Sequence, residues 1–205
     1  MSGFQVIAQA GEEIRNIFSK ALKNAGLGSG DPSSIVSLAP PAKENERTLS
    51  LWLYLVTENE HVRNRPNIVE KDGVIRPPPL ALTLYYLATP GIASNSDGLA
   101  ADEAISNSAK VLGVVLQTLH ARPVVALDKA PNGNSETTSE QLHLSLCRLS
   151  IEDLARIWEA LDHPYRLSIC FKVNIVRIES LRQTIAKPVT EREFITGRLK
   201  QNASR

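Results

Sequence analysis

The sequence predicts an α/β (α+β) fold in which helices flank a mixed, mostly antiparallel central sheet. Two stretches place large apolar side chains at every other position: residues 48–56 carry Leu49, Leu51, Leu53 and Leu55, and residues 80–87 carry Leu80, Leu82, Leu84 and Tyr86. A period of two is typical of a strand, because successive side chains of an extended chain point to opposite faces. The second face of each stretch is also largely apolar, so we expect central strands with both faces covered. Two longer segments repeat apolar residues every three or four positions and predict helices.

The first helix is predicted over residues 3–25, where Phe4, Ile14, Phe18 and Leu22 fall on one stripe. Three glycines between residues 26 and 30 end it, since glycine tolerates the left-handed conformation at helix ends. A second helix is expected over about 99–120. A third, shorter helix over about 151–160 begins with Ser150-Ile-Glu-Asp153, which resembles a capping box.

Four further segments read as strands. They are residues 35–38, 124–127, 142–147 and 165–178, and the last is the longest alternating run of the chain. The polar segment 128–139 is expected to be an exposed loop. After Glu179 the alternation is lost, and a short helix is predicted over 190–199. We therefore expect one domain over residues 1–180 and a C-terminal extension or arm over 181–205.

Composition excludes several classes of protein. The 205 residues carry 23 basic and 22 acidic side chains, and this balance gives no case for nucleic acid or an anionic membrane as the main partner. No apolar run approaches the about 18 residues of a transmembrane helix, and residues 1–10 do not have the pattern of a signal peptide. The two cysteines, Cys147 and Cys170, suit reduced, buried thiols of a cytosolic protein better than a disulfide framework.

The sequence offers no catalytic residue, cofactor site or metal site. It has no nucleophile elbow, phosphate loop or dinucleotide fingerprint. The glycines of residues 26–30 follow a helix rather than a strand, so a linker is favoured over a nucleotide site. His143 and Cys147 would lie about 13 Å apart on one strand, too far to share a zinc ion. A Cys/His nucleophile pair stays open from the sequence alone.

The best candidate for an interaction surface is the polar connection between the two leucine strands. We single out His61, Arg63, Asn64, Arg65 and Arg76. Arginine guanidinium groups pair with carboxylates through two parallel hydrogen bonds, and neighbouring prolines stiffen the connection. The plain alternative is an exposed hairpin loop with ordinary arginines.

The basic C-terminal tail is a second candidate surface, in which we single out Arg182, Lys187 and Arg192. Such a tail is either a frayed terminus or an arm that becomes ordered on a neighbouring subunit. The sequence leaves both open.

Four segments, in this order along the chain, resemble one family. They are Leu49-Ser-Leu-Trp-Leu-Tyr-Leu-Val-Thr-Glu-Asn-Glu-His-Val-Arg-Asn-Arg-Pro66, Pro78-Pro-Leu-Ala-Leu-Thr-Leu-Tyr-Tyr-Leu-Ala-Thr89, Leu112-Gly-Val-Val-Leu-Gln-Thr-Leu-His-Ala-Arg-Pro-Val124, and Leu149 to Leu161 with His163-Pro-Tyr-Arg-Leu-Ser168. Together they look like the cap, or tail-terminator, proteins of phage-tail-like contractile injection systems of the virulence-cassette and antifeeding-prophage type. The resemblance spans roughly residues 5–180.

The resemblance implies a structural role with no catalytic residues. A homohexameric ring would close the distal end of the particle, stop polymerisation of the inner tube and bind the last ring of the sheath. Its partners would be copies of itself, the inner tube protein and the sheath protein. Assembly would take place in the cytoplasm, and the cap would be incorporated into a particle that is released or anchored.

Two other classes are weighed against the cap. The first is an adaptor or connector protein of a related phage-tail-like assembly. The second is an enzyme that uses Cys147, Cys170 or a histidine.

Overall fold

The computed structural model describes residues 4–41, 47–69, 73–91, 101–127 and 140–185. The chain forms two compact units. The larger unit consists of Met1–Arg65 and Pro79–Glu179, and the smaller unit of Pro66–Pro78 and Ser180–Arg205. The predicted loop over 128–139 and the predicted helix over 190–199 lie outside the described residues.

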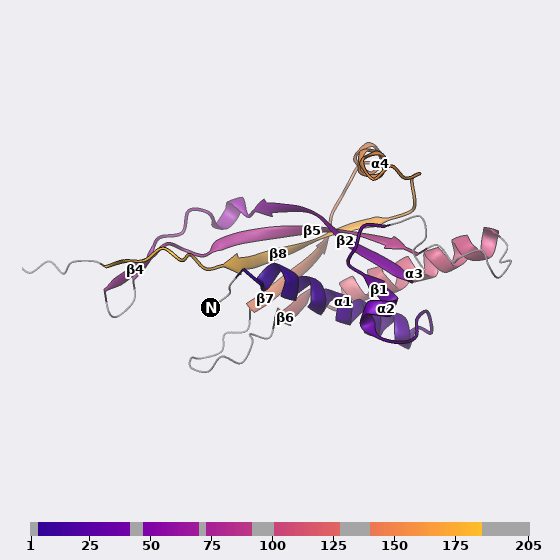
Figure 1. The fold of residues 1–205 in the computed structure, drawn as a ribbon, viewed down its shortest axis with the longest axis horizontal. Helices are drawn as coiled ribbons and strands as arrows, with labels where there is room; N and C mark the ends of the chain where they lie inside the picture. The colour runs from indigo at the N-terminus through magenta and orange to yellow at the C-terminus, as the bar shows by residue number, and fades with distance from the viewer. Residues whose placement is uncertain (1–3, 42–46, 70–72, 92–100, 128–139, 186–205) are drawn as a thin grey trace, which may run out of the picture. The chain divides into compact units, whose positions relative to one another are not determined.

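A six-stranded sheet forms the centre of the larger unit, in the order β1-β2-β5-β8-β7-β6 (Figure 1). Its strands are β1 (Val36–Ser37), β2 (Leu49–Glu58), β5 (Leu80–Pro90), β6 (Val124–Leu127), β7 (Glu140–Leu146) and β8 (Ile169–Ile178). Only β1 and β2 run parallel, and the other neighbours are antiparallel. This arrangement confirms the predicted mixed, mostly antiparallel sheet.

Helices cover both faces of this sheet. The described helices are α1 (Val6–Asn24), α2 (Pro32–Ile35), α3 (Ala101–Ala121) and α4 (Ile151–Ala160). Figure 1 shows α1 and α3 on one side of the sheet and α4 on the other. The fold therefore matches the prediction of a sheet flanked by helices.

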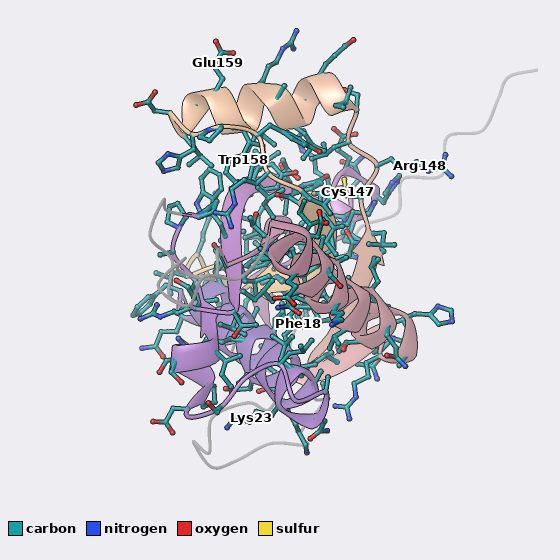
Figure 2. The ribbon with its side chains drawn as sticks, turned by 90° about the vertical axis from the view of Figure 1, so that its right-hand side faces the viewer. Phe18, Lys23, Cys147, Arg148, Trp158 and Glu159 are labelled. Atoms are coloured by element: carbon teal, nitrogen blue, oxygen red, sulfur yellow. The ribbon has the colours of Figure 1, made fainter. Side chains whose placement is uncertain are left out.

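The core lies between the sheet and the layer of α1 and α3, and three aromatic rings stand at its centre. Phe171 of β8 meets Phe18 of α1 edge-on with ring centroids 5.7 Å apart. On its other side Phe171 stacks on Tyr86 of β5 at 5.5 Å. All three side chains are buried, and Figure 2 shows Phe18 deep in the molecule. This cluster joins α1 to the two central strands.

The predicted start of α4 is confirmed at its N-terminal cap. Ser150 Oγ accepts a hydrogen bond from the Asp153 N–H at 3.1 Å. The Ser150 hydroxyl donates in turn to Asp153 Oδ2 at 2.8 Å. The Asp153 carboxylate thus accepts a hydrogen bond from the Ser150 hydroxyl, whereas in a capping box it would accept one from a backbone amide.

The expected strand over 35–38 is wrong at its start. Pro32 opens the short helix α2, because proline suits the first helical position, where the missing N–H would have no partner. The Ser34 hydroxyl donates to the Asp31 carbonyl at 2.7 Å and closes the turn. Ile35 therefore ends a helix, and β1 contains only Val36 and Ser37.

The expected strand over 165–178 also begins later than predicted, at Ile169. Its neighbour β5 ends at Pro90, and proline has no N–H to donate to a ladder. Around this point side-chain bonds replace the ladder. The Thr89 and Ser168 hydroxyls lie 3.0 Å apart, and the Arg166 guanidinium donates to the Pro90 carbonyl.

The second half of β2 corrects the expectation that both faces of this strand are covered. Leu55 and Val56 are 45% and 42% exposed. Among the described strands, β1 pairs with β2 only at Leu49 and Ser50. The outer edge of β2 beyond Ser50 therefore has no described strand beside it.

We predict that replacing Phe171 with alanine lowers the free energy of unfolding by about 3–5 kcal/mol, because the change leaves a cavity between α1 and β5. Urea denaturation measures the loss. Phe4→Ala is the matched control: Phe4 is 85% exposed, so its loss should change stability by less than about 0.5 kcal/mol. Equal losses in the two variants would contradict the central role of Phe171.

Candidate interaction sites

Hydrogen bonds within the larger unit hold the start of the connection that follows β2. Asn59 caps a short 3-10 helix, η1 (Glu60–Val62), by accepting a hydrogen bond from the His61 N–H at 3.1 Å. The Asn59 N–H donates to the Ala81 carbonyl of β5 at 2.8 Å. The Asn59 side chain also donates to Thr83 at 3.4 Å, and Thr83 donates to Asn174 of β8 at 3.2 Å. The start of the connection is thus tied to the two central strands.

Four of the residues singled out from the sequence lie together in this turn. His61, Arg63, Asn64 and Arg65 are all exposed. Arg63 Nε lies 3.7 Å from Glu58 Oε1, with the two side chains 67% and 40% exposed. An ion pair this exposed contributes little to stability, so Arg63 can exchange Glu58 for a partner carboxylate at small cost.

The smaller unit is built on a three-stranded sheet in the order β3-β4-β9. Its strands are β3 (Ile68–Val69), β4 (Val74–Arg76) and β9 (Thr184–Ile185). Gly73 takes a positive φ of 75° at the start of β4, a conformation open to glycine. The pairs Val74–Ile185 and Ile75–Thr184 join the returning connection to the C-terminal tail.

This small sheet places Arg76 and Arg182 in the same unit. Arg76 ends β4, and the backbone N–H of Arg182 donates to Ser180 Oγ at 3.1 Å, just before β9. Lys187 and Arg192 lie outside the described residues. The structure thus divides those singled-out residues that it describes between two places: the exposed turn of the larger unit, and the small sheet.

Strand β9 was not foreseen from the sequence. The signal that it left is slight: two adjacent residues with branched β-carbons, Thr184 and Ile185, in a segment without alternation. Three apolar side chains of the small sheet remain open to solvent. Ile68, Val69 and Ile185 are 49%, 66% and 77% exposed. A surface that exposes apolar side chains together with arginines is typical of a protein interface.

A part-buried polar contact lies on the sheet face that carries Trp52 and Tyr85. Tyr54 Oη is 3.0 Å from Cys170 Sγ, and its ring lies 6.1 Å and 6.2 Å from the rings of Trp52 and Tyr85. Burial raises the pKa of the Cys170 thiol to about 12, with neighbouring Cys147 adding to the rise and the bond from Tyr54 opposing it. Burial also raises the pKa of Tyr54. At neutral pH the Cys170 thiol is protonated and is a poor nucleophile.

Within the described residues, no group of three or more His, Cys, Asp or Glu side chains is placed to hold a metal ion. The helices described in the structure include none that is long and apolar enough to cross a membrane.

Comparison with solved structures defines the class of fold. The chain is similar to the sheath/tube terminator of an extracellular contractile injection system, PVC, in its extended state, with a TM-score of 0.58 and 16% identity over 93% of this chain and 64% of that chain. A second similar structure is the anti-feeding prophage cap, a tube-terminating cap, with a TM-score of 0.46 and 17% identity over 89% of this chain and 60% of that chain. The chain thus spans less than two thirds of either protein. No curated protein matches it.

The sequence itself gives the family. The family described as the Pvc16 N-terminal domain matches residues 11–192. The chain belongs to this family, which confirms the resemblance seen in its four ordered segments. The match runs past Glu179 and includes Arg182, Lys187 and Arg192.

We predict that stability falls between pH 9 and pH 12 partly because of Cys170. The folded pKa lies above the unfolded value, so the contribution is complete below pH 9 and is lost as pH rises toward 12. Urea denaturation in the presence of a reductant should show a steeper decline for the unmodified protein than for Cys170→Ala. Parallel declines would rule out this role for the thiol.

Proposed function

We propose that this chain is a structural cap, or tail terminator, that closes the distal end of the inner tube and sheath of a contractile injection system as a ring. The observation that carries the proposal is membership of the Pvc16 N-terminal domain family over residues 11–192. The fold, similar to that of a sheath/tube terminator, supports it.

The proposed partners are other copies of the chain, the inner tube protein and the sheath protein. A ring of six copies is proposed from the resemblance. The cap would assemble in the cytoplasm and then form part of the particle, whether that particle is released or anchored. Its action needs no catalysis: a terminator binds the last ring of the tube and presents no surface for a further ring.

Imaging tests the proposal directly. Particles produced without this chain should have tubes of uncontrolled length, and added protein should restore a fixed length. Negative-stain images should show a sixfold ring at one end of each particle. A ring that binds elsewhere in the assembly would favour the adaptor or connector instead. Alanine replacement of Cys147 and Cys170 without loss of assembly would leave the enzyme little support.

We predict that the double reversal Arg63→Glu and Arg65→Glu reduces the fraction of capped particles about tenfold or more, as loss of a buried arginine contact does. The reason is that the exposed turn is proposed to pair with carboxylates of the tube or of a neighbouring subunit. The matched control reverses Lys23 and Lys110, two exposed cations on α1 and α3. If capping survives the turn reversal as well as it survives the control, the turn is no interface.

The C-terminal extension, residues 181–205, is proposed to reach the sheath or an adjacent cap subunit. We predict that a chain ending at Ser180 loses sheath attachment, while its larger unit still folds.

A second chain that ends at Ile185 keeps β9 and Arg182 and lacks Lys187 and Arg192. Loss of attachment in both chains assigns the contact to residues beyond 185. Loss in the shorter chain alone assigns it to the small sheet. Attachment in both would refute the arm. Pull-down of assembled sheath provides the measurement.

A further inference from the structure

The two cysteines of the chain lie opposite each other across neighbouring strands. β7 and β8 pair antiparallel, with Leu146 opposite Phe171. The next pair in this register is Cys147 and Cys170. A hydrogen bond continues the ladder there, from the Cys147 N–H to the Cys170 carbonyl at 2.9 Å.

In a sheet of ideal geometry, two residues in this register are close enough for a disulfide. Residues of a hydrogen-bonded antiparallel pair have Cα atoms about 5.5 Å apart, and disulfides span Cα separations of about 4.4–6.8 Å. Directly opposed residues also point to the same face of the sheet. Both cysteines are free thiols, Cys170 buried and Cys147 half-buried.

The pair stands at the base of the segment that carries α4. This segment leaves the sheet at Cys147 and returns at Ile169, and Figure 2 marks Cys147 and Arg148 where it leaves. Trp158 packs this segment against the sheet. Its indole is 1% exposed and faces the sheet in Figure 2. The Arg166 guanidinium lies 5.9 Å from the centre of the indole ring. Other apolar side chains of the segment remain open, with Ile151 72% and Leu167 55% exposed. The segment is therefore weakly embedded, and a bond at its base would restrict it.

We propose that Cys147 and Cys170 form an intramolecular disulfide that ties the base of the α4 segment once the particle leaves the reducing cytoplasm. The timing rests on the proposed function and, in addition, on release of the particle from the cell. The pairing of the two thiols rests on the strand register alone.

A low-molecular-weight disulfide such as oxidised glutathione is the oxidant. The Cys147 thiolate, the more exposed of the two, attacks one sulfur of the oxidant and releases one glutathione thiolate, which takes up a proton. The Cys170 thiol then loses its proton to water, and its sulfur attacks Cys147 Sγ. This second step breaks the mixed disulfide and releases the second glutathione thiolate. Two cysteine thiols are oxidised, and one glutathione disulfide is reduced to two thiols.

Tyr54 is a positioning residue for the second step. Its hydroxyl lies 3.0 Å from Cys170 Sγ and can donate to the sulfur as negative charge develops. Without this donor the buried thiolate is harder to form. Tyr54→Phe should therefore slow closure about tenfold while leaving the first attack at Cys147 unchanged.

The test uses the full chain, purified in reductant and transferred to mixtures of reduced and oxidised glutathione. We expect the intact mass to fall by two hydrogens, and a non-reducing peptide map to link Cys147 to Cys170. The urea midpoint should rise on oxidation and return on reduction, and neither change should occur in Cys147→Ser or Cys170→Ser. In Tyr54→Phe, the glutathione adduct of Cys147 should accumulate before closure.

Three results would overturn the pairing: a stable glutathione adduct in the unmodified chain, a disulfide between two copies, or two free thiols in oxidising buffer. To test the timing, the cap chain is taken from released particles and its thiols are labelled. The proposed timing would be wrong if the cap chain from released particles had free thiols while the isolated chain formed the disulfide. A chain that fails to cap but still closes its disulfide would refute the proposed function and leave the pairing intact.

Discussion

The contact on which the rest of the structure depends is the packing of Phe171 between Phe18 and Tyr86. It fixes α1 against the two central strands of the sheet with rings that are fully buried. The same two strands, β5 and β8, supply Thr83 and Asn174, which hold the base of the exposed turn through Asn59. A rigid core of this kind places surface side chains reproducibly, which the proposed ring of identical copies would require.

Burial differs between the described strands. The central strand β5 is covered along almost its whole length, whereas β2 loses cover beyond its first residues, and the small sheet keeps Ile68, Val69 and Ile185 in contact with solvent. Burial of apolar surface contributes about 25 cal/mol of stabilising free energy for each Å² removed from water. An isolated chain lacks this contribution at each exposed apolar side chain. Contacts with neighbouring copies, tube or sheath would recover it. The exposed apolar side chains of β2 and of the small sheet are therefore the ones that the proposed assembly would use.

Local sequence patterns predicted most helices and strands, whereas pairing between distant segments determined where some strands begin and end. Leucine alternation was sufficient for β2 and β5, and Ser150 with Asp153 marked the start of α4, because these signals lie within a few neighbouring residues. β9 and the late start of β8 depend on partners far along the chain: β4 for the first, Pro90 for the second. His61, Arg63, Asn64 and Arg65 are exposed, and their role as an interface stays a prediction, because no pattern in the sequence assigns their contacts.

The pairing of Cys147 with Cys170 also depends on residues far apart in the sequence. It makes the contact between Tyr54 and Cys170 different from the other polar contacts of the sheet. Thr83 of β5 bonds Asn174 of β8, Thr89 of β5 bonds Ser168 just before β8, and Tyr54 reaches from β2 past β5 to Cys170 of β8. All three are neutral pairs near pH 7, since burial raises the pKa values of Tyr54 and Cys170, so moderate changes of pH leave them intact. Of the three, only the last contains an atom that oxidants alter. A change of redox compartment therefore acts on the sheet at Cys170, whereas a modest change of pH does not.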